Sequence, residues 1–308
     1  MKQSVKVFAP ATISNVGPGF DLMGFAIEEP GDILIIRQNI SGFLRIINNT
    51  PCQIPEDPKK NVATVSAAAL LKAAGSGQGF DFYFETKINP GSGIGSSAAS
   101  SAAAVVGVNA LLNNPFTIDE LLPFAMEGET LASGSEHADN IAPALLGGFI
   151  LIRSYNPIDI ISLKYPENLY CTVVHPDIEI KTSESRKLIP KEFPINMVLK
   201  QCGNIAGLIA GLTTSDYRLI GRTLDDSIAE PIRAGLIPGY HELKSKLHEN
   251  GALGGNISGS GPAIFALSNS PGNANEVAGF MGKTFDNLGI KNNVYVSKVS
   301  DKGTRLID

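Results

Sequence analysis

Pro90-Gly91-Ser92-Gly93-Ile94-Gly95-Ser96-Ser97-Ala98-Ala99-Ser100 opens a stretch that continues in small residues to Ala104. Glycines at alternate positions let successive backbone N–H groups converge on an anion. A helix that starts directly after them adds its unpaired N–H groups and the positive end of its dipole. The stretch, here called the first glycine loop, therefore predicts a phosphate-binding site. A glycine-rich turn that serves only packing remains the alternative.

The segments on either side of the first glycine loop support a strand–loop–helix unit. Residues 80–88 alternate apolar and polar side chains as a strand does, and residues 98–112 continue as a helix. Gly95 is followed by two serines, which excludes a Walker loop, and no second strand ending in an acid follows, which excludes a dinucleotide fold. Lys and Arg are absent between Lys87 and Arg153. We therefore expect backbone N–H groups and a metal ion to neutralise a bound polyphosphate.

The composition of the whole chain bounds the class of protein. With 308 residues and 43% apolar residues, the chain is long enough for two compact lobes. A net charge of −5 without a Lys/Arg block argues against a nucleic-acid or membrane-surface partner. Three cysteines lie far apart, and no leader or long apolar run is present. We expect a cytoplasmic, reduced protein.

The first half predicts one α+β lobe with the first glycine loop at its edge. A strand through Val5–Ala9 leads into a loop at residues 10–21, in which Asn15 and Asp21 are suited to hold a polar substrate. An Asx-turn and a cap are the alternative for these two residues. Strands at 33–37 and 43–47 predict a hairpin with its turn at 41–42, and a helix capped by Asn61 follows.

An acidic segment follows the helix that starts with the capping-box pattern at residues 117–120. Glu127, Glu129, Glu136 and Asp139 lie within fourteen residues that also contain His137 and Asn140, without Lys or Arg. Solvent exposure accounts for Glu127 and Glu136 taken singly. The set as a whole, next to a phosphate loop, is better explained by a divalent cation.

The second half predicts a ferredoxin-like lobe. Strands are expected at 147–153, 158–161 and 169–175, and we place the lobe boundary at 154–164, which divides the chain into residues 1–160 and 161–308. Arg233 lies between two prolines, which suits either a surface residue or an arginine that clamps a carboxylate. A second glycine loop at residues 251–262 precedes a strand. Two glycine loops from two lobes suggest a cleft between the lobes.

Three motifs in order, at residues 10–21, 90–99 and 254–262, resemble the galactokinase, homoserine kinase, mevalonate kinase and phosphomevalonate kinase (GHMP) superfamily. Within it, Pro-Ala-Thr-Ile-Ser-Asn-Val-Gly-Pro-Gly-Phe-Asp from Pro10, Glu-His-Ala-Asp-Asn-Ile-Ala-Pro from Glu136 and Glu-Pro-Ile-Arg-Ala-Gly-Leu-Ile-Pro-Gly from Glu230 resemble the homoserine kinases. The resemblance covers nearly the whole chain. It implies a two-lobed α+β fold: a ribosomal-protein-like N-terminal lobe, a ferredoxin-like C-terminal lobe and an active site in the cleft.

The resemblance also implies a reaction and its residues. ATP would phosphorylate the side-chain hydroxyl of L-homoserine, giving O-phospho-L-homoserine for threonine biosynthesis, with Mg²⁺ and commonly a homodimer. Residues 90–100 with Gly259 and Ser260 would bind ATP, Ser97 and Glu129 would bind the metal, and Glu129, Asp139 and Asn140 would be catalytic. The substrate-binding residues implied by the resemblance are Asn15, Asp21, His137, Asn140, Arg186 and Arg233. Both arginines would take the carboxylate of homoserine and Asp21 its ammonium group.

Two other functions stay open at this point. The chain is alternatively a kinase for another small alcohol such as mevalonate, or a non-catalytic ATP-binding module. Asp21 with Arg186 and Arg233 favours an amino acid, because mevalonate has no ammonium group. Mevalonate kinases carry a Lys in the first motif, which is absent here, so we favour direct attack of the hydroxyl without a strong base. Whether Asp139 acts as a base is left open by the sequence.

Overall fold

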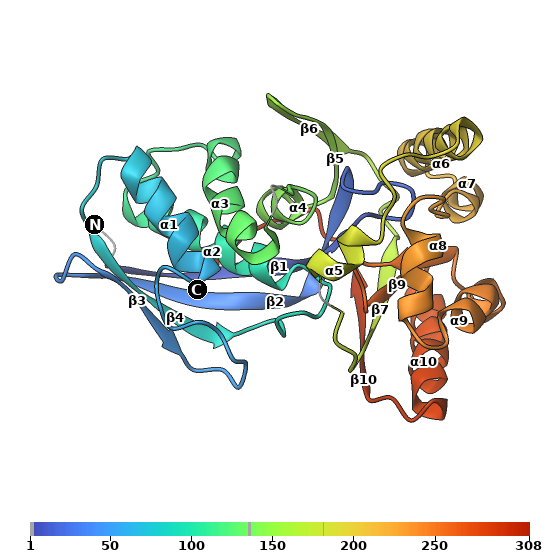
Figure 1. Ribbon diagram of the computed structural model, residues 1–308. Coiled ribbons are helices and arrows are strands. Elements are labelled where there is room, and N and C mark those ends of the chain that lie inside the picture. Colours follow the sequence, from blue (N-terminus) through green and yellow to red (C-terminus); the bar gives the residue numbers. More distant parts are fainter. Residues whose placement is uncertain (1–2, 135–136, 181) are drawn as a thin grey trace.

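The computed structural model describes residues 3–134, 137–180 and 182–308, which form two lobes (Figure 1). The larger lobe contains a seven-stranded sheet in which β11, β1, β2, β4 and β3 are neighbours in that order, and β5 pairs with both β2 and β6. Its strands are β1 (Ser4–Ser14), β2 (Met23–Asn39), β3 (Leu44–Asn48), β4 (Gly79–Thr86), β5 (Phe149–Tyr155), β6 (Ile158–Leu163) and β11 (Arg305–Ile307).

Helices cover one face of the larger sheet (Figure 1). They are α1 (Val62–Ala73), α2 (Ser96–Leu111), α3 (Leu122–Ser133), which a 3₁₀ turn at Asp119–Leu121 precedes, and α4 (Ile141–Leu146). Small residues allow α2 to lie against the sheet, and a Cβ on Gly107 would be 2.5 Å from Cδ1 of Ile36. Close packing of α2 fixes its N-terminus, which carries the first glycine loop, at the junction between the lobes.

The smaller lobe has a four-stranded antiparallel sheet in the order β10, β7, β9, β8. Its strands are β7 (Tyr170–Pro176), β8 (Gly254–Ile257), β9 (Ile264–Ser268) and β10 (Asn292–Lys298). Its helices are α5 (Thr182–Lys187), α6 (Ile195–Thr214), α7 (Tyr217–Arg222), α8 (Glu230–Arg233), α9 (Tyr240–Lys246) and α10 (Pro271–Asn287), with 3₁₀ turns at Ala234–Leu236 and His248–Asn250. A separate apolar cluster that includes Tyr240, Leu243, Met281 and Phe285 fills this lobe.

Most elements expected from the sequence are confirmed. The strand before the first glycine loop is β4 and the helix after it is α2, so the strand–loop–helix unit is present. Asn61 caps α1, since its side chain accepts a hydrogen bond from the N–H of Ala63 at 3.0 Å. Glu120 accepts from the N–H of Thr117 at 2.8 Å, which is one half of the predicted capping box.

Two expectations for the first lobe are wrong. The hairpin at residues 33–47 does not form, because β4 lies between β2 and β3 and pairs with β3 in parallel. Phe80, Phe82 and Phe84 make β4 the more apolar strand, which takes the inner position and leaves the half-buried β3 at the edge. The loop predicted from Pro10 begins only after Ser14. A shift in register between Pro10 and Thr12 allows β1 to continue past the proline.

The chain crosses from the larger sheet to the smaller one between β6, which ends at residue 163, and β7, which begins at residue 170. It returns at its end, since β11 pairs antiparallel with β1 and the C-terminus lies beside the first lobe (Figure 1). The division into residues 1–160 and 161–308 stays a prediction. Among the residues that the structure describes, no helix is both long and apolar enough to span a bilayer.

Candidate active site

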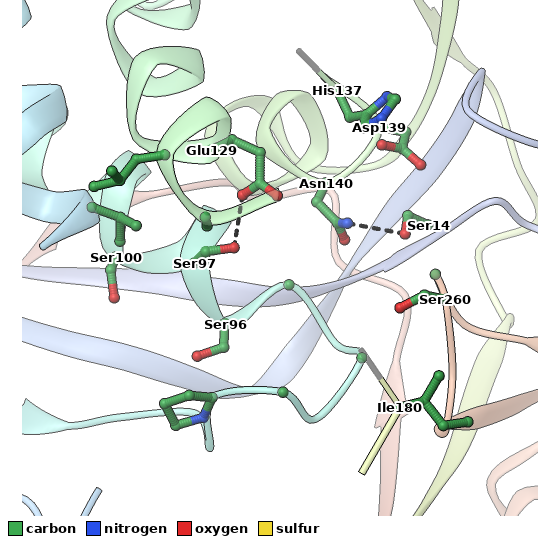
Figure 2. Close-up of a pocket in the computed structure, with 18 of the residues that line it drawn as sticks. Ser14, Ser96, Ser97, Ser100, Glu129, His137, Asp139, Asn140, Ile180 and Ser260 are labelled. Atoms are coloured by element: carbon green, nitrogen blue, oxygen red, sulfur yellow. Dashed lines mark hydrogen bonds between the residues drawn. The ribbon is translucent and has the colours of Figure 1, made fainter. Parts of the chain in front are cut away.

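A cavity of about 430 Å³ lies where the two lobes meet. It is lined by the first glycine loop, by Glu129, Asp139 and Asn140, by Asp21, Arg186 and Arg233, and by the tip of the second glycine loop at residues 259–261. Figure 2 shows Ser97 and Glu129 on one side of this cavity and His137 and Asp139 on the other, with Asn140 between them. Residues from six separate segments of the chain therefore converge on one site.

The backbone of the first glycine loop has the form of an anion cradle. Gly91, Gly93 and Gly95 all have left-handed φ angles, of 78°, 73° and 70°. No side chain among the described residues caps the N-terminus of α2, which leaves its first N–H groups for another acceptor. A Cβ on Gly95 would lie 2.0 Å from Oγ1 of Thr12, so only glycine fits there. These features fit the phosphates of a nucleotide.

Both lobes hold the first glycine loop in place. The hydroxyl of Ser258 in the second glycine loop donates to the carbonyl oxygen of Gly93 at 2.6 Å. The N–H of Thr12 in the first lobe donates to the carbonyl oxygen of Ile94 at 3.1 Å. Beneath the loop, buried Asp32 accepts from the hydroxyl of Ser100 at 2.6 Å. The loop is thus a rigid part of the fold.

Lys87 corrects the expectation that the phosphate region has no nearby cation. Its side chain is 4% exposed and lies 3.1 Å from a carboxylate oxygen of Asp32. The ammonium group also donates to the carbonyl oxygen of Ser96 at 2.9 Å, and both Lys60 and Lys87 line the cavity. Burial raises the pKa of Asp32, and the Lys87 charge opposes that rise. The sequence gap between Lys87 and Arg153 therefore does not make the cavity free of lysine.

Ser97 and Glu129 form a hydroxyl–carboxylate pair at the start of α2. The hydroxyl of Ser97 donates to Oε2 of Glu129 at 2.7 Å (Figure 2). Burial raises the pKa of Glu129 to about 7, and the Ser97 hydrogen bond opposes this. Hard oxygen donors of this kind suit Mg²⁺, which takes one or two carboxylates and completes its shell with phosphate oxygens and water.

The acidic segment does not form one cluster. Glu127 is exposed, Glu129 and Asp139 are buried at the cavity, and Glu136 lies outside the described residues. No group of three or more His, Cys, Asp or Glu residues that could hold a metal is found in the described part of the chain. A metal at this site would therefore depend on Ser97, Glu129 and the bound nucleotide rather than on a cage of carboxylates.

Asp139 and Asn140 lie side by side with different surroundings. Burial raises the pKa of Asp139 to about 7, and the charges of Asp21 and Glu129 add to the rise. The amide of Asn140 accepts from Oγ1 of Thr12 at 2.8 Å and donates to the hydroxyl of Ser14 at 2.9 Å. Asn140 is therefore tied to the end of β1, whereas Asp139 is a buried acid that titrates near neutrality.

Asp21, Arg186 and His137 meet as a second group of side chains in the cavity. One guanidinium nitrogen of Arg186 donates to both carboxylate oxygens of Asp21, at 2.7 and 2.9 Å. Nδ1 of His137 lies 3.9 Å from Asp21, and burial lowers the pKa of His137, which keeps the imidazole neutral near pH 7. The sequence provided these residues singly, and the structure brings them together.

Arg233 is 3% exposed and lines the same cavity. Its guanidinium donates to the hydroxyl of Ser185 at 3.1 Å and to the carbonyl oxygen of Gly259 at 2.7 Å. Burial is the main cause that lowers its pKa, while the charge of Asp21 opposes this. The short helix α8, which has Pro231 in its first turn, therefore points the arginine inward, which excludes the alternative of a surface residue.

The amide of Asn15 links the two lobes. Its oxygen accepts from the N–H of Asp21 at 3.0 Å, and its nitrogen donates to the carbonyl oxygen of Gly259 at 2.8 Å. The first of these bonds joins residues six apart, so it is not the Asx-turn of the alternative, in which the side chain bonds to the backbone two residues on. Asn15 itself has a left-handed φ of 67°. Any contact of Asn15 with a substrate would use an amide already engaged on both sides.

Sequence reasoning missed one wall of the cavity. Ile54, Pro55, Val62 and Phe84 lie beside the first glycine loop and provide apolar surface. The segment before α1 has no motif, and only its proline and apolar residues distinguish it. Such a wall suits the flat base of a nucleotide whose phosphates lie on the loop.

Comparison with known proteins agrees with this geometry. The family model for the GHMP kinases N terminal domain matches residues 61–148. The family model for the GHMP kinases C terminal domain matches residues 208–287. A homoserine kinase from Chlorobium phaeobacteroides (strain BS1) is 46% identical over 99% of this chain and 100% of that protein. One from Pyrococcus abyssi is 37% identical over 95% of this chain and 96% of that protein.

Solved structures give the same result. A homoserine kinase from Cytophaga hutchinsonii has a TM-score of 0.95 and 47% identity, and the match covers 100% of this chain and 98% of that one. A mevalonate kinase from L. major, solved with R-mevalonate, has a TM-score of 0.75 at 17% identity over 97% and 98% of the two chains, which shows a shared fold alone. The chain belongs to the GHMP kinase family, and the relatives named above that are 37–47% identical to it over nearly their full length are homoserine kinases.

Proposed function

We propose that this protein transfers the γ-phosphoryl group of ATP to the side-chain hydroxyl of L-homoserine and so makes O-phospho-L-homoserine for threonine biosynthesis. One observation carries the proposal beyond the names of the relatives. One cavity is lined both by an anion cradle and by a carboxylate with two guanidinium groups. An amino acid presents one charge of each sign, and each finds an opposite partner there.

The nucleotide would lie along the first glycine loop. Residues 90–100 and the N-terminus of α2 would receive the phosphates, with Gly259 and Ser260 closing the site from the other lobe. The apolar wall at residues 54–62 would take the base. Ser97 and Glu129 would hold Mg²⁺, which neutralises charge on the transferred group when bound.

The amino acid would take over existing charge pairs. Asp21 would leave Arg186 to accept the ammonium group, and Arg186 and Arg233 would then share the carboxylate. His137 and Asn140 line the same cavity, where they can orient the hydroxyl (Figure 2). The neutral imidazole adds no charge that would compete with the ammonium group.

Catalysis would rest on positioning and charge neutralisation, since phosphoryl transfer has a loose transition state. Glu129 would contribute as a ligand of the metal, together with the hydroxyl of Ser97. The hydroxyl would attack directly, and Asp139 is the neighbouring acid that could accept its proton, because its pKa of about 7 matches that of an effective base. Replacing Asp139 distinguishes direct attack without a base from attack in which Asp139 accepts the proton.

A substrate panel tests the proposal. ADP release would be measured with L-homoserine, mevalonate and shikimate at saturating ATP and Mg²⁺. We expect turnover with homoserine and little with the other two, which lack an ammonium group. Turnover of mevalonate but not homoserine would contradict the proposal, and no turnover of any alcohol would support a non-catalytic ATP-binding module. The expectations of a cytoplasmic homodimer, and of no nucleic-acid or membrane partner, remain proposals as well.

A further inference from the structure

Phe20 lies directly before Asp21 in the loop between β1 and β2, and its half-buried ring contacts both arginines. The guanidinium carbon of Arg186 lies 5.5 Å from the ring centroid, and that of Arg233 lies 5.3 Å from it. Both distances are in the range of cation–π contacts. One ring from the first lobe therefore joins two cations from the second lobe.

Two guanidinium groups at one site repel each other. The charge of Arg186 contributes to lowering the pKa of Arg233, after the larger effect of burial. Arg233 has fixed neutral partners in Ser185 and Gly259, but the hydrogen bonds of Arg186 described here go to Asp21. The faces of an aromatic ring carry negative partial charge, so Phe20 offsets the repulsion without adding a carboxylate that would compete with the substrate.

We propose that Phe20 is a positioning residue that holds the two guanidinium groups together for the carboxylate of the amino-acid substrate. The inference rests on the proposed function. When the ammonium group of the substrate draws Asp21 away from Arg186, the ring contact stays and keeps that arginine beside Arg233. Phe20 acts through the arginines, and its effect should reach only substrates that carry a carboxylate.

Steady-state kinetics of three variants test this role. Phe20→Leu removes the ring, and Phe20→Tyr keeps it. Phe8→Leu is the matched control, because Phe8 makes the same kind of contact with Arg305, at 4.6 Å, away from the cavity. Each is assayed with L-homoserine and with 3-amino-1-propanol, which is homoserine without its carboxylate.

For Phe20→Leu we expect the homoserine KM to rise about tenfold with kcat within about twofold, the scale of two lost cation–π contacts. The KM of Phe20→Leu for 3-amino-1-propanol should stay within about twofold of the wild-type value. For Phe20→Tyr and Phe8→Leu, both KM and kcat should stay within about twofold of the wild-type values. An unchanged homoserine KM, or equal losses with both substrates, would overturn the role of Phe20. If the wild type itself fails to phosphorylate homoserine, the proposed function fails and this inference fails with it.

Discussion

The two ends of the cavity are built in different ways. The phosphate end, residues 90–100 with Glu129, is mostly one continuous stretch whose backbone conformation is fixed by three glycines and by packing. The amino-acid end, Phe20, Asp21, His137, Arg186 and Arg233, consists of side chains from both lobes that contact one another. The local sequence therefore determines the structure of the phosphate end, whereas the packing of the two lobes against each other determines that of the amino-acid end.

The difference predicts how each end responds to substitution. A change at the phosphate end should disturb a rigid backbone or a metal ligand, and so affect turnover and folding. A change at the amino-acid end should remove one of several charges and affect mainly the affinity for the amino acid. The following substitutions test this contrast.

The largest effect is expected for Glu129→Gln. Loss of the carboxylate should lower kcat by about a hundredfold or more, since a group that stabilises transition-state charge is lost. Glu127→Gln is the control, because Glu127 lies on the same helix but is exposed. Turnover that survives Glu129→Gln undiminished would remove Glu129 from the metal site.

The same substitution should stabilise the protein without ligands. The folded pKa of Glu129 is about 7, above its ordinary value of 4.5, so the fold favours the protonated acid. This stabilising contribution is complete below pH 4.5 and is lost as the pH rises towards 7. Glu129→Gln should therefore be more stable than the wild type by roughly 1–3 kcal/mol at pH 8 and equal to it near pH 4.5. Denaturant unfolding without nucleotide or Mg²⁺ measures both values.

Gly95→Ala should have the next largest effect. The added Cβ would meet Oγ1 of Thr12 at 2.0 Å with φ at 70°, which disturbs the first turn of α2. We expect a loss of about thirtyfold in kcat/KM for ATP and roughly 2 kcal/mol or more in stability. Gly289→Ala has the same φ of 70° with open space around it, so it reports the conformational cost alone. Equal losses in stability for both variants would show that contact with Thr12 is unimportant.

The same contrast explains what could be predicted from the sequence. Strand, glycine loop and helix around residues 79–111 follow from local periodicity and φ requirements, and they were predicted correctly. The insertion of β4 between β2 and β3 was missed, because the hairpin pattern at 41–42 is local while the pairing depends on a crossover through α1. Sequence periodicity does not report which strand becomes the inner one.

The site residues also divide into those that local sequence predicts and those whose contacts depend on distant segments of the chain. Lys87 directly follows β4, and nothing in the local sequence shows that its side chain folds under Ser96 to meet Asp32. The role of Arg186 came from a family resemblance, whereas the two prolines around Arg233 already allowed a carboxylate clamp, which the resemblance then favoured. Phe20 was missed because its partners belong to the other lobe, so no sequence pattern links the ring to them.

Arg233→Ala tests the amino-acid end with a smaller expected effect. The homoserine KM should rise about tenfold with kcat nearly unchanged, as expected for a group that binds ground state and transition state alike. Arg305→Ala is the control, because Arg305 also contacts a phenylalanine ring but lies outside the cavity. A kcat loss comparable to that of Glu129→Gln would mean that the two ends do not differ as proposed.

The smallest effect is expected for Asp139→Asn, which lies between the two ends. Direct attack by the hydroxyl predicts a loss in kcat of less than about tenfold, because a loose transition state needs little deprotonation of the nucleophile. A general base predicts a loss of about a hundredfold to ten-thousandfold. Burial raises the pKa values of both Glu129 and Asp139 to about 7, so the pH profile of the wild type alone does not separate them.

The pH–rate profile of Asp139→Asn separates the titration of Glu129 from that of Asp139. If Glu129 must be ionised to hold the metal, kcat/KM for ATP in this variant should still fall as the pH drops below about 7. Loss of that acid limb together with a large loss in kcat would identify Asp139 as the base. A small loss with the limb retained would assign the titration to Glu129, and would place the pH sensitivity of the enzyme at its phosphate end.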